Sequence, residues 1–167
     1  MDALELLTRA SIWLSVGCWA LGVAALIQRK ADAGSRRLWT AGLLLYLVHS
    51  ILAFARFYDW SHAMAFEETA AQTLMATGFE SGAGIWFNYA FGMIWSVDAA
   101  YWWVAGTPRY TERPKFIQRS IHGFMAFMIF NGTVVFGHGF VVAFGTLVFA
   151  GLGWLAMKFR FCRPAVS

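Results

Sequence analysis

Charged residues are scarce in this chain, and their scarcity excludes an ordinary soluble domain. Only 13% of the residues are Asp, Glu, Lys or Arg, whereas soluble domains carry about 25%. Hydrophobic residues make up 59% of the 167 positions, which is more apolar surface than a single domain of this size can bury. Because a bilayer is the solvent that accepts such a surface, the composition predicts an all-α integral membrane protein with one domain over 1–167.

The chain also has few cysteines and no recognisable catalytic motif. Two cysteines are too few for a disulfide framework. No Gly-rich loop joins a strand to a helix as a phosphate site requires, and no Ser-His-Asp or Cys-His arrangement indicates a nucleophilic enzyme. The net charge of +4 does not indicate nucleic-acid binding, because the basic residues stand in short clusters between apolar runs. These patterns therefore predict no particular reaction.

Apolar runs separated by basic loops predict the membrane spans. The last run, 121–157, contains no charged residue and is much longer than the ~20 residues that one span needs. We interpret it as two helices joined at Gly137-His138-Gly139, because glycines give the backbone the freedom for a tight reversal. Five spans are then predicted, over about 10–27, 39–57, 83–105, 117–136 and 140–157.

The distribution of Lys and Arg favours five spans over four. Cytoplasmic segments of membrane proteins carry an excess of these residues. Basic residues cluster in the loops 28–38 and 106–119 and in the tail after 157, whereas Arg56 is the only one in the second connection. Five spans place all three clusters on one side. We therefore expect a multi-pass protein with its N-terminus outside and its C-terminus in the cytoplasm.

The segment between the second and third spans is polar and predicts an amphipathic helix over about 60–77. Asp59 or Ser61 is expected to cap its start, and Gly78 its end. Apolar residues such as Met64 and Phe66 offer one face. We expect this helix to lie at the outer interface or to cover the outer mouth of the bundle.

Ionisable residues inside the spans are the first candidates for a functional site. At about 1.5 Å per residue, His49, Asp98 and His122 are predicted to share one layer between the inner face and the middle of the membrane. Asp98 should face the bundle interior and have a partner, since a charge in the bilayer is costly. One hypothesis is that the three residues bind a cofactor, which would be haem, copper or a quinone. The other is that they make structural hydrogen bonds between helices.

A second polar layer is predicted at the outer face. His62, His138 and Glu67 are candidate metal ligands there, because imidazole and carboxylate groups bind transition metals. The spacing matches no known metal motif, since His62 and Glu67 are five residues apart and helical neighbours are three or four apart. The alternative is a titratable surface histidine beside Trp60.

Three stretches of the sequence carry a resemblance to a group of proteins. They are HSILAFARFYDWSHAMAFEETAAQT, GAGIWFNYAF followed by WSVDAAYWW, and FNGTVVFGHG. Over about residues 45–140 the chain resembles a group of small, uncharacterised polytopic inner-membrane proteins of bacteria. The resemblance implies a bacterial inner membrane and five spans, but no activity. His138 departs from the pattern of the group, which argues against a role for it in a shared mechanism.

Three functions fit these patterns. Small size and the lack of a catalytic motif favour an accessory or assembly subunit that works beside a larger membrane complex or as a homo-oligomer. The first alternative is a redox, metal-handling or haem-handling protein that uses His49, Asp98 and His122. The second is a proton-coupled transporter or channel. The partner that the composition implies is the lipid bilayer, and nucleic acid is not expected.

Overall fold

The computed structural model describes residues 2–161, and helices account for most of them. The α-helices are α1 (Ala3–Ile27), α2 (Ala33–Phe57), α3 (His62–Thr77), α4 (Gly84–Glu112), α5 (Lys115–Phe130) and α6 (Phe140–Phe161), and a π-helical turn, η1 (Asn131–Val135), continues α5. No strand occurs over residues 2–161. The predicted all-α class is confirmed.

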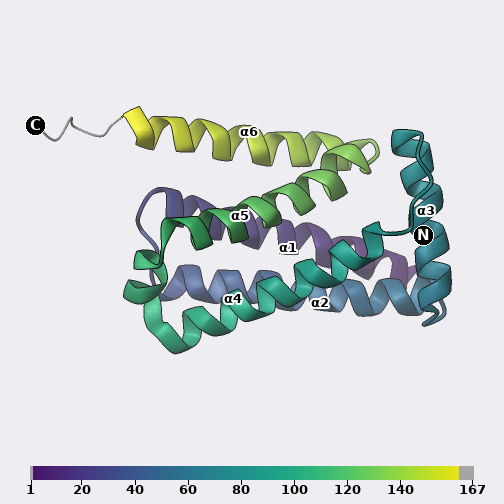
Figure 1. Ribbon diagram of the computed structural model, residues 1–167, viewed down its shortest axis with the longest axis horizontal. Coiled ribbons are helices and arrows are strands. Elements are labelled where there is room, and N and C mark those ends of the chain that lie inside the picture. The colour runs from purple at the N-terminus through teal and green to yellow at the C-terminus, as the bar shows by residue number, and fades with distance from the viewer. Residues whose placement is uncertain (1, 162–167) are drawn as a thin grey trace, which may run out of the picture.

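The long direction of the molecule is followed by α1, α2, α4, α5 and α6, and α3 crosses one end of them (Figure 1). Successive long helices run in alternating directions, so the connections alternate between the two ends. One end carries the N-terminus, α3 and the turn at 136–139. The opposite end carries the turn at 28–32, the segment 106–114 and the end of α6. The two basic loops of the sequence therefore belong to the end that faces away from α3.

Among residues 2–161, three helices are long and apolar enough to cross a membrane. They are Ala3–Ile27, Ala33–Phe57 and Phe140–Phe159. α5 has 16 residues by itself, fewer than the ~20 of a complete span. The structure thus supports a helical membrane protein with three apolar helices, and the arrangement of five spans stays a prediction.

Local sequence signals set several helix ends. Asp32 begins α2 with a capping box, in which its carboxylate accepts a hydrogen bond from the Ser35 N–H at 2.8 Å. The Ser61 hydroxyl accepts a hydrogen bond from the Met64 N–H at 3.3 Å and begins α3. Gly78 ends α3 in a left-handed conformation with φ of 80°, which glycine adopts without strain. Ser61 rather than Asp59 is therefore the cap, and Gly78 ends the helix as expected.

The last apolar run folds as two helices. η1 prolongs α5 by five residues, and α6 begins at Phe140. Between them Gly139 has a φ of 55°, so the chain reverses where glycines were expected to permit it.

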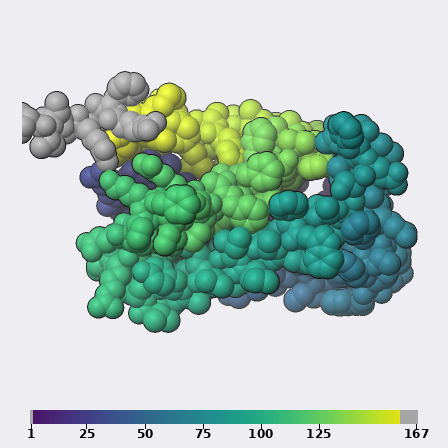
Figure 2. Space-filling view, in the orientation of Figure 1, coloured from purple at the N-terminus to yellow at the C-terminus, as the bar shows by residue number. Residues whose placement is uncertain are grey.

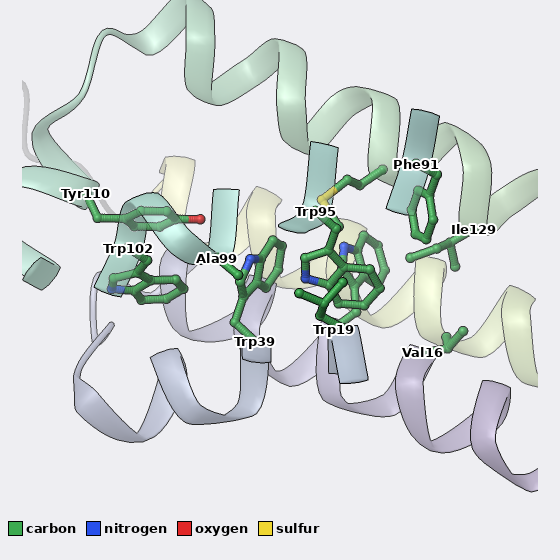
Figure 3. Close-up of a cluster of buried hydrophobic side chains, with 11 residues drawn as sticks. Val16, Trp19, Trp39, Phe91, Trp95, Ala99, Trp102, Tyr110 and Ile129 are labelled. Carbon is green, nitrogen blue, oxygen red and sulfur yellow. The ribbon is translucent and has the colours of Figure 1, made fainter. Parts of the chain in front are cut away.

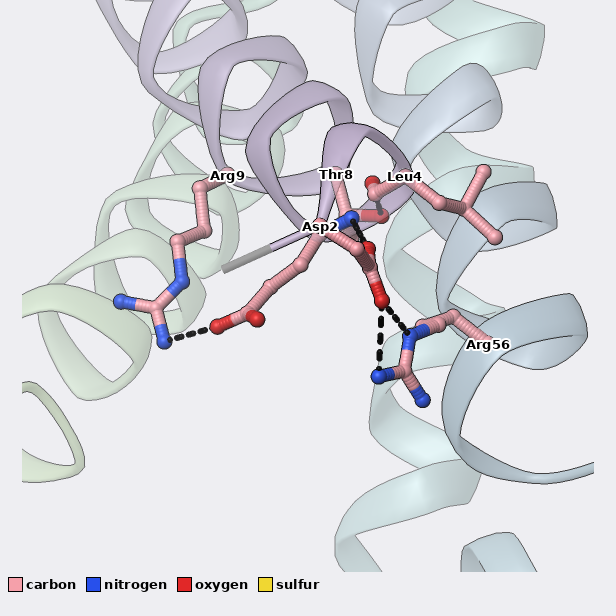
Figure 4. Close-up of polar contacts among 6 residues, drawn as sticks. Asp2, Leu4, Thr8, Arg9 and Arg56 are labelled. Carbon is pink, nitrogen blue, oxygen red and sulfur yellow. Dashed lines mark hydrogen bonds and ion pairs between the residues drawn. The ribbon is translucent and has the colours of Figure 1, made fainter.

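The N-terminus is attached to the end of α2 by polar contacts (Figure 4). Asp2 caps α1 by accepting a hydrogen bond from the Glu5 N–H at 2.8 Å. Its other carboxylate oxygen lies 2.9 Å from a guanidinium nitrogen of Arg56. Both side chains of this ion pair are substantially exposed, so it contributes little to the stability of the contact between α1 and α2.

The core of the bundle is a row of tryptophans (Figure 3). Trp19, Trp39, Trp95 and Trp102 are each at most 1% exposed. The ring of Trp39 lies between those of Trp95 and Trp102, at centroid distances of 5.6 and 6.2 Å. Trp39 and Trp102 are buried because α2 and α4 pack against each other through these rings.

Candidate functional site

α4 is interrupted at Gly106, and the interruption creates a buried polar site. Gly106 has φ of 74° and ψ of 165°, a non-helical conformation that glycine reaches easily. The chain then turns back, and Pro108 stands near the start of the short helical stretch that follows. As a result the ring of Tyr110 stacks on Trp102, with centroids 3.9 Å apart and planes inclined by 7°.

Asp98 forms a buried ion pair with Arg113, which this reversal of the chain brings inward. The Asp98 and Arg113 side chains are 0% and 4% exposed. One carboxylate oxygen accepts a hydrogen bond from the guanidinium, and the other accepts one from the Tyr110 hydroxyl at 2.7 Å. The guanidinium carbon lies 4.2 Å from the centroid of the Tyr110 ring. Asp98 therefore has the interior partner that its position required, although the partner comes from a basic loop.

His122 joins this ion pair through the arginine. The second terminal nitrogen of Arg113 lies 3.2 Å from His122 Nε2. A guanidinium only donates hydrogen bonds, so Nε2 is the acceptor and Nδ1 carries the proton. His122 Nδ1 and Arg113 Nε are both buried without a partner among the described residues. We call Asp98, Tyr110, Arg113 and His122 the Asp98 network.

His49 does not belong to the Asp98 network. Its Nδ1 donates a hydrogen bond to the backbone carbonyl of Thr8 at 2.9 Å, near the start of α1. The expected shared layer was wrong for His49 because α2 begins at Ala33, six residues before the start that the sequence suggested. His49 therefore lies about 24 Å along α2, toward the end that α3 covers.

The candidate metal ligands of the outer layer are also dispersed. His62 Nδ1 lies 2.9 Å from the Tyr89 hydroxyl, with which it shares a hydrogen bond, and its ring packs against Trp86 at 5.1 Å. Glu67 lies on α3, and His138 lies in the turn before α6. Over residues 2–161 no three His, Cys, Asp or Glu side chains are grouped so that they could hold a metal ion. Neither His62, His138 and Glu67 nor His49, Asp98 and His122 form such a group.

A cavity of about 690 Å³ lies at the end of the bundle that α3 covers. This volume is within the range of about 300–1,000 Å³ that is usual for small-molecule sites. Figure 2 shows a small opening between α3 and the end of the bundle where α6 begins. Every helix contributes to the wall, including Trp13, His49, Thr73, Asn88, Phe127, Asn131 and Phe144.

The sequence did not predict the cavity, nor the roles of Arg113 and Tyr110. Arg113 was counted among the basic loop residues that report topology. Gly106 and Pro108 mark a place where a helix is interrupted, but they do not show which later side chain turns inward. That depends on the backbone conformation at Gly106, which a glycine can adopt but does not have to adopt.

Comparisons with protein families, curated proteins and solved structures find no match for this chain.

Proposed function

We propose that this protein crosses a bacterial inner membrane five times and binds a small amphipathic molecule in the cavity beneath α3. Five spans are supported by the common axis of α1, α2, α4, α5 and α6 (Figure 1). Apolar side chains on α4 and α5 are strongly exposed, as lipid contact requires, among them Met93, Val97 and Phe116. The basic loops then lie in the cytoplasm and α3 lies outside. The bacterial location is the one that the sequence resemblance implies.

A pair of reporter fusions tests this topology. An enzyme that is active only in the cytoplasm should be active when fused after Ser167 and inactive when inserted at 79–81, between α3 and α4. Activity at 79–81, or its absence after Ser167, would contradict five spans with the N-terminus outside. The same fusions also test whether the Asp98 network lies at the cytoplasmic end.

The cavity is the single observation that carries the functional proposal. Its wall comes from six helices and η1, so it is a feature of the whole bundle and not a gap between two neighbours. Most of the wall is aromatic or aliphatic, and ten Ser, Thr, Asn, Gln or His side chains, among them His49 and Asn88, interrupt it. This combination is typical of sites that enclose an organic ligand.

The cavity and the Asp98 network support the other functions suggested by the sequence to different degrees. A quinone is an amphipathic molecule of the kind that the cavity suits. A haem or metal site has less support, because Asp98 and His122 already accept hydrogen bonds from the Arg113 guanidinium. An accessory role beside a larger complex is compatible with ligand binding, and co-purification of such a complex would support it.

Fluorescence quenching tests whether the cavity binds a ligand. Trp13 and Trp95 line it, so a brominated molecule bound there should quench their emission. We suggest 4-bromo-4′-hydroxybiphenyl and its methyl ether as neutral probes, titrated into protein in lipid nanodiscs. Saturable quenching by either probe supports the proposal. Quenching that rises linearly with both probes would reflect partition into lipid and would overturn it.

A pair of glycine substitutions provides the control. A side chain added at Gly132, which lines the cavity, meets no atom within 4 Å at its Cβ. Gly123 on α5 is equally open, but it does not line the cavity. Gly132→Leu should therefore weaken the saturable quenching, whereas Gly123→Leu should leave it unchanged.

A further inference from the structure

Six of the hydroxyl groups that line the cavity donate their protons to backbone carbonyls. Ser15 donates to the Gly42 carbonyl at 2.7 Å, and Tyr46 donates to the Asn88 carbonyl at 2.8 Å. Ser50, Thr69, Thr73 and Thr133 do the same with carbonyls of their own helices. Each hydroxyl has one proton. These oxygens therefore offer a ligand only their lone pairs.

His49 presents a further acceptor. Its Nδ1 donates to the Thr8 carbonyl, and because a carbonyl can only accept, Nδ1 carries the proton of the neutral ring. Nε2 is then an acceptor, and it has no hydrogen-bond partner among the described residues. The Asn131 amide nitrogen donates to the Phe127 carbonyl at 2.7 Å, which leaves its side-chain oxygen as another acceptor.

The wall contains no charge that could pair with a charged ligand. None of the described residues that line the cavity is Asp, Glu, Lys or Arg. An ion buried there would lose its hydration without gaining a counter-ion. Donors are present as well, since the Trp95 indole N–H lines the cavity and is buried without a partner among the described residues, so the preference for a hydroxyl rests on the acceptor at His49 Nε2.

We infer that the cavity selects a neutral, hydroxyl-bearing amphipathic molecule, whose hydroxyl donates a hydrogen bond to His49 Nε2 while its apolar body lies against the aromatic wall. This inference rests on the proposed ligand-binding function and names the ligand class. A phenol, a hydroquinone or an apolar alcohol satisfies it. A quinone cannot make this hydrogen bond, because it has no proton to donate to His49 Nε2.

The matched pair of brominated probes tests the inference directly. The phenol and its methyl ether differ in the hydroxyl proton, which only the phenol can donate. In the wild-type protein we expect the phenol to bind about tenfold more tightly, the effect of one well-formed hydrogen bond. His49→Phe should reduce this preference to less than about threefold. Ser96→Ala should keep it, because Ser96 does not line the cavity and its hydroxyl donates to the Gly92 carbonyl.

A measurement on the wild-type protein covers the case in which His49→Phe does not fold. With labelled histidine, the ¹⁵N resonance of His49 Nε2 should shift when the phenol is added and should not shift with the ether. Equal saturable affinity for both probes would overturn the hydroxyl preference and leave the ligand-binding function in place. Tighter binding of 4-bromobenzyl-trimethylammonium than of the phenol would overturn the neutrality of the ligand. A lack of saturable quenching by any probe would overturn both proposals.

Discussion

Replacing Asp98 by asparagine is the most direct test of how the end of the bundle that faces away from α3 is held together. The substitution keeps the shape of the side chain and removes its charge, so the Arg113 guanidinium becomes a buried cation without a counter-ion. Solvent cannot compensate for the loss, since both side chains are nearly inaccessible. Breaking a buried ion pair by removing one partner costs about 3–5 kcal/mol, and we expect Asp98→Asn to lower the free energy of unfolding by that amount.

The assay is unfolding by sodium dodecyl sulfate in mixed micelles, followed by circular dichroism and tryptophan emission. Asp98→Asn, Arg113→Gln and the double variant form a double-mutant cycle. We expect a coupling energy of about 1–3 kcal/mol, because the second substitution adds little once the first has broken the pair. A loss below about 1 kcal/mol for Asp98→Asn with additive effects in the cycle would refute a buried ion pair here.

Two other predictions concern helix packing and helix capping. A Cβ added at Gly42 would lie 2.9 Å from the ring of the buried Trp95, so Gly42→Ala should destabilise the protein by about 1–3 kcal/mol. Gly123→Ala meets open space and should stabilise it by about 0.5–1 kcal/mol in the same unfolding assay. At the start of α2, the Ser35 backbone N–H lowers the pKa of Asp32 below the unfolded value of 3.8. The stability from this cap is complete above that value and is lost as the pH falls through the folded pKa. Asp32→Ala should therefore show a smaller drop in melting temperature than the wild type between about pH 5 and pH 2, and equal drops would contradict the cap.

Much of the fold could be predicted from local patterns. The caps of α3 followed from the serine and glycine that bound its polar sequence, because a cap depends on a few adjacent residues. The reversal before α6 followed from glycines inside a run too long for one span. The need of Asp98 for a partner followed from the cost of a charge in an apolar environment. Each of these inferences requires only residue identity and neighbouring positions.

The candidate site was predicted less well. Placing His49 beside Asp98 assumed that α2 begins near residue 39, whereas it begins at Ala33. A shift of six residues moves a side chain by about 9 Å along a helix, which is enough to take His49 from the Asp98 network to the cavity. Helix starts are the least certain part of a prediction from sequence. A depth that is counted in residues from a predicted start therefore contains the error of that start.

The sequence by itself determined that this is an apolar all-α chain with basic connections and a capped polar helix between two apolar ones, because composition and short-range chemistry dictate those features. Only the tertiary structure decided that Arg113 turns inward to Asp98 and that His49 faces a cavity beneath α3. The first depends on the backbone conformation at Gly106, and the second depends on how α1 and α2 lie side by side. Both features arise from packing between segments that are distant in the sequence. The identities of the residues allow this packing but do not specify it.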